Sequence, residues 1–236
     1  MRGLGTLLIG GMAIASAWGQ FVYPRAQDNV AESGLYKEDP FITAYRKRYF
    51  AVFRGDFATF RKAHAEIKTL IAKNPRDPRA LVWYGNGQTI EAGLLKMSDP
   101  KRAASLLAES RRTLDRAVAL RPSDPNIYMM RAATLYSQGQ YWSAKELPRT
   151  VWTTLRDDCR RFVEFLGPKR LPRVSIHIRG ETFGEMGIAM KNLGDVAGAE
   201  AAFRRVIALC PDTPYEERAR KEIALLDAKG AQSGAR

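Results

Sequence analysis

The chain has 236 residues, of which 45 % are hydrophobic and 27 % are charged, a composition that excludes extensive disorder. Its 38 Lys and Arg against 25 Asp and Glu give a net charge of +13, which suits either an anionic partner or a well-solvated surface. Two cysteines are too few for a disulfide scaffold and match no zinc or haem spacing. We therefore expect Cys159 and Cys210 to be free thiols, with a single bridge as the alternative for an exported chain.

Residues 1–23 have the pattern of an export segment, because Arg2 precedes an apolar run that contains no acidic residue. Residues 4–23 are long enough to span a bilayer, and their aromatic end followed by Arg25 favours an uncleaved membrane anchor. The alternative is a signal peptide cleaved after Ala17. We expect a single-pass protein of the cell membrane with its domain on the extracytoplasmic (periplasmic) side or, in the second case, a protein secreted to the periplasm.

The segment that follows, residues 24–40, is rich in turn-forming residues and is expected to be a linker. A helical domain is expected over residues 41–228 and a flexible tail over 229–236. Within the domain one boundary signal recurs: a proline that ends a helix, an aspartate that can cap the next, and a second proline near its first position. The three copies lie at 74–78, 121–125 and 210–214.

These boundaries divide the domain into helical hairpins. The first is expected over 41–74 and the second over 77–124, where an insertion lets Asp99 cap a helix that begins at Pro100. The third hairpin departs from the pattern, because Pro148 stands in its second half and a long helix follows.

The last hairpin, residues 180–213, has the most specific spacing of aromatic, small and turn residues. The spaced residues are Phe183, Gly187, Gly194-Asp195, Ala199, Phe203 and Pro211. This pattern resembles the tetratricopeptide repeat, and the resemblance extends more weakly over residues 41–226. It implies an all-α protein of stacked antiparallel helical hairpins, a right-handed solenoid, with the last pair of helices at about 180–193 and 196–209. A final capping helix is expected over 215–228, with Ile223, Leu225 and Leu226 facing inward.

The resemblance also implies a protein-binding groove lined by the first helix of each hairpin. Carried over position by position, its residues are Tyr84, Gln88 and Glu91 in the second hairpin, Asn126, Met129 and Tyr136 in the third, and Glu181, Ile188 and Lys191 in the last. The groove is mixed in polarity and lacks the repeated Asn and Lys that grip a peptide's terminal carboxylate.

A second candidate surface is basic. Residues 167–173 contain two prolines and a glycine and are expected to form an exposed irregular loop. Its cations, Lys169, Arg170 and Arg173, suit anionic headgroups or an acidic partner. The acidic pair Asp157-Asp158 is expected to be neutralised by its neighbouring arginines.

Catalytic motifs are absent from the sequence. His64 and His177 have no metal-ligating neighbours at a suitable spacing, and no nucleophile elbow or phosphate loop occurs. We therefore expect no enzyme activity, no cofactor and no metal. The expected function is that of a membrane-tethered or exported scaffold or accessory subunit that binds other protein subunits of a membrane complex and does not bind nucleic acid. The alternative is a peripheral binder of anionic lipid or the cell-envelope surface through the basic loop.

Overall fold

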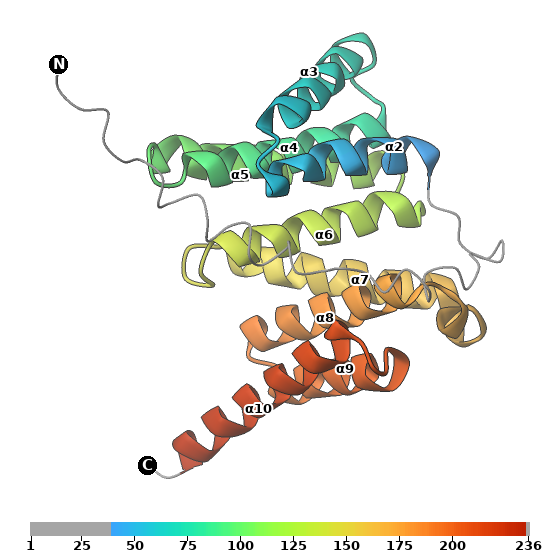
Figure 1. Cartoon of the computed structure of the whole chain (residues 1–236), viewed down its shortest axis with the longest axis vertical. Coiled ribbons are helices and arrows are strands. Elements are labelled where there is room, and N and C mark those ends of the chain that lie inside the picture. Colours follow the sequence, from blue (N-terminus) through green and yellow to red (C-terminus); the bar gives the residue numbers. More distant parts are fainter. Residues whose placement is uncertain (1–38, 235–236) are drawn as a thin grey trace.

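The computed structural model describes residues 39–234, and all regular elements in this range are helices (Figure 1). They are α2 (Pro40–Tyr49), η1 (Phe50–Arg54), α3 (Phe57–Lys73), α4 (Pro78–Leu95), α5 (Pro100–Leu120), α6 (Pro125–Tyr141), α7 (Arg149–Arg170), η2 (Leu171–Arg173), α8 (Ile176–Leu193), α9 (Val196–Leu209) and α10 (Pro214–Gly234). The prediction of an all-α protein is confirmed for this range.

The expected membrane segment 4–23 lies outside the described residues, as does the linker up to residue 38. The helix α2 begins at Pro40, the last residue assigned to that linker. Between residues 39 and 234, no helix is both long enough and apolar enough to span a bilayer.

Aspartate–proline pairs start four of the helices, as the sequence predicts for three of them. The side chains of Asp39, Asp77, Asp99 and Asp124 each accept a backbone N–H from the first turn of α2, α4, α5 and α6, at 2.8–3.0 Å. A proline follows each cap at the first helical position, where its missing N–H costs nothing. The N-terminal ends of these helices are therefore fixed by local sequence.

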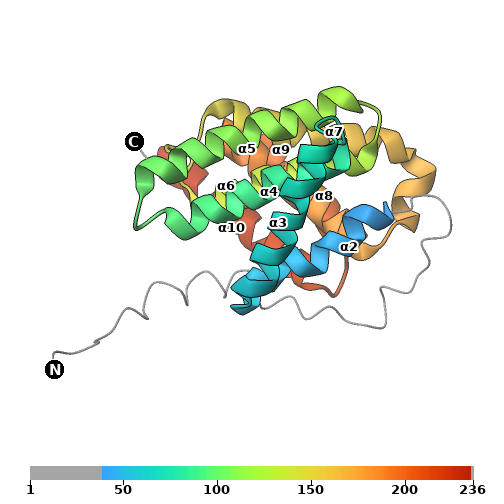
Figure 2. The same cartoon turned by 90° about the horizontal axis from the view of Figure 1, so that it is seen from above.

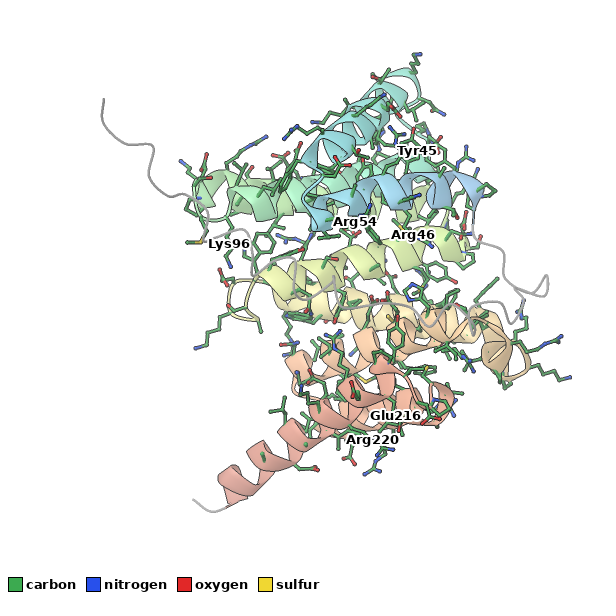
Figure 3. All side chains as sticks on the ribbon, viewed as in Figure 1. Tyr45, Arg46, Arg54, Lys96, Glu216 and Arg220 are labelled. Carbon is green, nitrogen blue, oxygen red and sulfur yellow. The ribbon has the colours of Figure 1, made fainter. Side chains whose placement is uncertain are left out.

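The start of α10 uses a different cap from the one the sequence suggests. Asp212 has a positive φ of 57° and lies outside the helix, and Thr213 Oγ1 accepts the backbone N–H of Glu216 at 3.4 Å. In return Glu216 Oε2 accepts the backbone N–H of Asp212 at 2.7 Å, and its other oxygen binds Arg220 at 2.6 Å. Figure 3 shows Glu216 and Arg220 beside the first turns of α10. The reciprocal bonds resemble a capping box shifted by one residue.

The helices form three rows when the molecule is viewed along its long axis. In Figure 2, α4, α6 and α8 occupy the middle row, with α5, α7 and α9 on one side and α2, α3 and α10 on the other. The packing agrees for most helices, because α4 contacts α5, α6 contacts α7 and α8 contacts α9, while α2 and α3 contact α4; α10 contacts α8 and, more extensively, α9. The middle helices are thus covered on two sides.

Glycines let the middle helices approach their neighbours closely. On the side of the following helix, three of them face a large side chain: Gly85 faces Leu114, Gly139 faces Trp152 and Gly187 faces Phe203. A Cβ atom at Gly187 would lie 2.6 Å from Cε1 of Phe203, which is closer than non-bonded carbon atoms in proteins approach. On the opposite side, Gly87 faces His64 of α3, and Gly180 faces Tyr215 of α10. The close contact expected for Gly187 is therefore present, and it recurs in two further hairpins.

The last hairpin agrees with the sequence in detail. The helix α9 has the expected bounds, Val196–Leu209, and α8 ends at Leu193 as expected but begins at Ile176, earlier than residue 180. Gly194 closes α8 in the left-handed conformation, with φ 85°. Phe203 is only 2 % exposed, so its predicted place in the core is confirmed.

Polar side chains cross the core between α4, α5 and α6. Gln138 Nε2 donates to Thr89 Oγ1 at 2.9 Å, and Thr89 shares a hydrogen bond of the same length with Ser110. Ser110 also donates to the backbone carbonyl of Gly85 at 2.7 Å. Because each buried group has a partner, this network fixes the register of the three helices without leaving an unpaired dipole.

One ion pair corrects a prediction. Asp158 is not neutralised by arginines of its own helix: Arg131 of α6 binds its two carboxylate oxygens at 2.7 Å each. Asp157 does pair locally, with Arg156 at 2.8 Å. The difference follows from the helix, because adjacent residues point in different directions and only Asp158 faces α6.

The segment 167–173 is not the irregular loop that the sequence suggests. Gly167, with φ 65°, kinks the chain, but helical turns continue on both sides, through the end of α7 and into η2. At the C-terminal end, α10 runs to Gly234 through most of the expected tail. Leu225, expected to face inward, is 54 % exposed, whereas Leu226 is buried. Both cysteines are buried and free, as expected.

Candidate binding pocket between α6, α8 and α10

Three of the predicted groove residues line one cavity. Tyr136 of α6 and Glu181 and Ile188 of α8 surround a volume of about 30 Å³. The cavity is completed by Glu185 of α8, Phe203 and Val206 of α9, and Tyr215 and Arg218 of α10. Its size suits a group as small as a water molecule, with a wider mouth outside it. Residues from two separate hairpins are thus brought together with the final helix.

The predicted groove residues of α4 lie elsewhere, because α3 and α5 cover them. Tyr84 stacks on the His64 ring of α3 with centroids 5.4 Å apart, and Glu91 lies 3.5 Å from the Lys68 ammonium of the same helix. Gln88 is buried and accepts the Thr113 hydroxyl of α5 at 3.0 Å. The sequence could not reveal this, because the resemblance assigns an open face to α4, whereas the chain's own α3 packs over it.

The other predicted groove residues are also engaged within the chain. Asn126 accepts the backbone N–H of Asp39 at 3.1 Å, and Met129 is half-buried against the core. Lys191 forms an ion pair with Glu222 of α10 at 2.5 Å. None of these three lines the cavity, although Lys191 helps to hold α10 on α8.

The histidine beside Tyr84 is a packing residue. His64 is stacked between Phe60 and Tyr84, and its Nδ1 shares a hydrogen bond of 2.9 Å with the Tyr49 hydroxyl. Burial, together with the nearby Lys68 ammonium, lowers the pKa of His64 to about 3. The ring is therefore neutral at physiological pH, in agreement with a structural role. Within the described part of the chain, no cluster of three or more His, Cys, Asp or Glu is suitable for a metal ion.

The deepest polar group of the cavity is Glu185. It is 3 % exposed, and neither carboxylate oxygen has a hydrogen-bond partner. Burial raises the pKa of Glu185 well above its ordinary value, the neighbouring Glu181 raises it further, and Arg218 partly offsets the rise. The protonated form is therefore favoured inside the closed cavity.

Aromatic and charged groups surround this carboxyl. Arg218 donates to the Tyr136 hydroxyl, and its guanidinium lies over the same ring at 5.5 Å from the centroid. On the other side, the Tyr215 hydroxyl shares a hydrogen bond of 2.6 Å with Nδ1 of His177, which lies 3.8 Å from Glu181. The cavity therefore combines aromatic rings, two carboxyl groups and one guanidinium.

Sequence reasoning missed Glu185, Tyr215 and Arg218. A signal for the first was present, because Glu181 and Glu185 are four residues apart and therefore lie on one face of α8. An acidic residue on the buried face of a helix is costly unless it has a use. Tyr215 and Arg218 lie on a helix for which only a capping role was expected.

The three cations of the proposed basic loop do not form one surface. Lys169 and Arg173 are exposed. Arg170 instead folds back on α7, where it donates to the carbonyl oxygens of Phe165 and Leu166 and lies 5.0 Å above the Phe165 ring. The N–H groups of its guanidinium thus provide hydrogen bonds to carbonyl oxygens that the kink at Gly167 leaves without helical partners.

No protein-family model matches the chain, and no curated protein matches it.

Proposed function

We propose that this protein is a helical scaffold of the tetratricopeptide type that holds a segment of another protein subunit against α6, α8 and α10. Residues 4–23 tether it to a membrane in this proposal, or residues 1–17 direct its export. The tether would place the helical domain beside the subunits of a membrane complex. Its task is then to present one binding face at a fixed position.

The observation that supports this proposal is the convergence of Tyr136, Glu181 and Ile188 on one cavity. The resemblance assigns these positions to the binding face from two separate hairpins, before any contact between the hairpins is considered. Concave sites that combine apolar walls with a few convergent polar groups are the usual places where proteins bind ligands. The repeated glycine contacts between paired helices also suit a protein built from related hairpins.

Site-specific photo-crosslinking tests the proposed binding face. Gly184 lines the cavity, and a Cβ atom added there has no neighbouring atom within 4 Å outside its own stretch of helix. Replacing Gly184 by benzoylphenylalanine should give one discrete, light-dependent adduct with another protein in native membranes. Gly93 of α4 is the matched control, because it is also helical and equally unobstructed but lies far from the cavity in the chain.

Adducts from both positions, or from neither, would contradict a specific binding face at α8. The tether needs a separate measurement, the N-terminal sequence of the protein recovered from membranes. A soluble protein that starts near Trp18 would remove the tether and leave an exported scaffold.

A further inference from the structure

The carboxyl of Glu185 lacks what buried carboxyl groups in proteins ordinarily have. Nearly all buried polar atoms find a hydrogen-bond partner, because an unpaired one loses its hydration and gains nothing in return. Both oxygens of Glu185 are buried and unpaired, and the side chain lines a cavity instead of filling the core. A group that enters this cavity could supply the missing partner.

The charged groups that face Glu185 determine which charge a group entering the cavity must carry. Glu181 on α8 is negative and Arg218 on α10 is positive, so these two balance. From α7 the Cys159 thiol also faces it, and burial, together with Glu185 itself, raises the pKa of that thiol, which keeps it neutral. Tyr136 of α6 is neutral, and α9 contributes the apolar Phe203 and Val206. An ionised Glu185 therefore lacks one positive charge.

Arg218 does not supply that charge at hydrogen-bonding distance. Its guanidinium is held by the Tyr136 hydroxyl and lies over the Tyr136 ring. It is thus oriented toward the wall of the cavity, and the oxygens of Glu185 stay unpaired. The position beside Glu185 is left for a second cation.

The shape and lining of the cavity narrow the choice of cation. A volume of about 30 Å³ favours a compact head the size of an ammonium group over a second planar guanidinium with its five donors. The rings of Tyr136, Phe203 and Tyr215 and the side chain of Ile188 suit an alkyl stem, and aromatic faces attract cations. A ligand with such an alkyl stem and ammonium head resembles a lysine side chain.

We propose that this cavity binds a primary ammonium group on an alkyl stem, with the ammonium on the Glu185 carboxylate. The inference rests on the proposed function in one respect: the lysine of a bound protein segment is taken as the source of the ammonium. A free alkylamine offers the same chemistry and is the other source to be distinguished.

Binding is linked to pH. Glu185 must lose its proton to pair with the ammonium, so each binding event releases about one proton while pH lies below the pKa of the empty site. The affinity should then rise about tenfold per pH unit in that range. The affinity should level off above the pKa of the empty site and fall where the ligand's own ammonium deprotonates, near pH 10.

Calorimetric titration of the full-length protein tests the inference. The probe is N-acetyl-lysine methylamide, the uncharged comparison is N-acetyl-norleucine methylamide, and n-butylamine represents a free amine. We expect heat from the lysine compound, none from the norleucine compound, and an apparent proton release when two buffers of different ionisation enthalpy are compared. Tighter binding of the lysine compound than of n-butylamine assigns the site to a polypeptide, and the reverse assigns it to a free amine.

The decisive variant is Glu185→Gln, which keeps the shape and removes the charge. It should weaken binding of the lysine compound at least tenfold, while its melting temperature stays equal to or above that of the parent because the variant removes a buried carboxyl that has no partner. The matched control is Glu164→Gln, which removes an exposed acid on α7 and should leave binding unchanged. Equal binding by parent and Glu185→Gln, equal binding of the norleucine compound, or no binding of either amine would overturn the inference.

The two proposals fail separately. An adduct from position 184 without lysine binding would leave the scaffold function standing and remove the ammonium site. Amine binding without an adduct would leave the ammonium site and remove the protein partner.

Discussion

Replacing Phe203 by Ala should destabilise the protein by about 3–5 kcal/mol, because a large buried ring is lost and the walls around it collapse only in part. Phe203 is 2 % exposed and packs against Gly187 of α8 and the cavity beneath α10. Urea denaturation followed by circular dichroism measures the free energy of unfolding. Phe57→Ala is the matched control: Phe57 is 38 % exposed, so its loss should change that free energy by only about 0.5 kcal/mol.

A double-mutant cycle with Gly187 makes this prediction specific to the contact. Gly187→Ala alone places a Cβ 2.6 Å from the Phe203 ring, so overpacking of about 1–3 kcal/mol opposes the gain of about 1 kcal/mol in helix propensity. In the Phe203→Ala background the clash is gone, and the same change should stabilise the protein by about 1 kcal/mol. The coupling should therefore be about 1–3 kcal/mol. Effects that add within about 0.5 kcal/mol would refute the reasoning.

Three further predictions use the same denaturation measurement. Asp158→Asn should cost about 3–5 kcal/mol because it leaves Arg131 without its buried partner, whereas Asp157→Asn should cost about 0–1 kcal/mol because its pair with Arg156 is exposed. His64 binds a proton in the unfolded chain near pH 6.5 but in the folded chain only near pH 3, so it lowers the free energy of unfolding progressively as pH falls from 6.5 to 3. His64→Gln should therefore flatten this part of the curve of unfolding free energy against pH. An unchanged curve would contradict the burial of the ring. Thr213→Ala should cost about 1 kcal/mol as a lost helix cap, and no loss would mean that Glu216 alone holds this end.

Sequence reasoning succeeded where the signal is local. A capping side chain and the backbone N–H that donates to it lie two or three residues apart, so Asp77, Asp99 and Asp124 could be placed at helix starts without any tertiary information. The same holds for Gly194, whose left-handed turn ends α8. The bounds of α9 were expected from the tetratricopeptide resemblance, whose turn at Gly194-Asp195 and closing Pro211 flank this helix.

Sequence reasoning was incomplete where interacting residues are distant from each other in the chain. Asp158 has several arginines nearby in sequence, yet its partner is Arg131, because the direction of the side chain from α7 decides the pairing. Tyr84 was expected in an open groove, and α3 covers it, since nothing in the local pattern of α3 specifies which helix it packs on. Glu185 belongs to the same class, because the unpaired state of its oxygens depends on four helices at once.

The glycines of the middle row have a consequence for how the molecule unfolds. Each glycine inside a helix lowers its intrinsic stability by about 1 kcal/mol relative to alanine, so α4 and α8, which hold several, are poor helices in isolation. They persist because they pack against helices on both sides. Helical order in the middle and docking of the flanks are therefore one event. Amide hydrogens of α4, α6 and α8 can exchange with solvent only through cooperative opening that releases their neighbours as well.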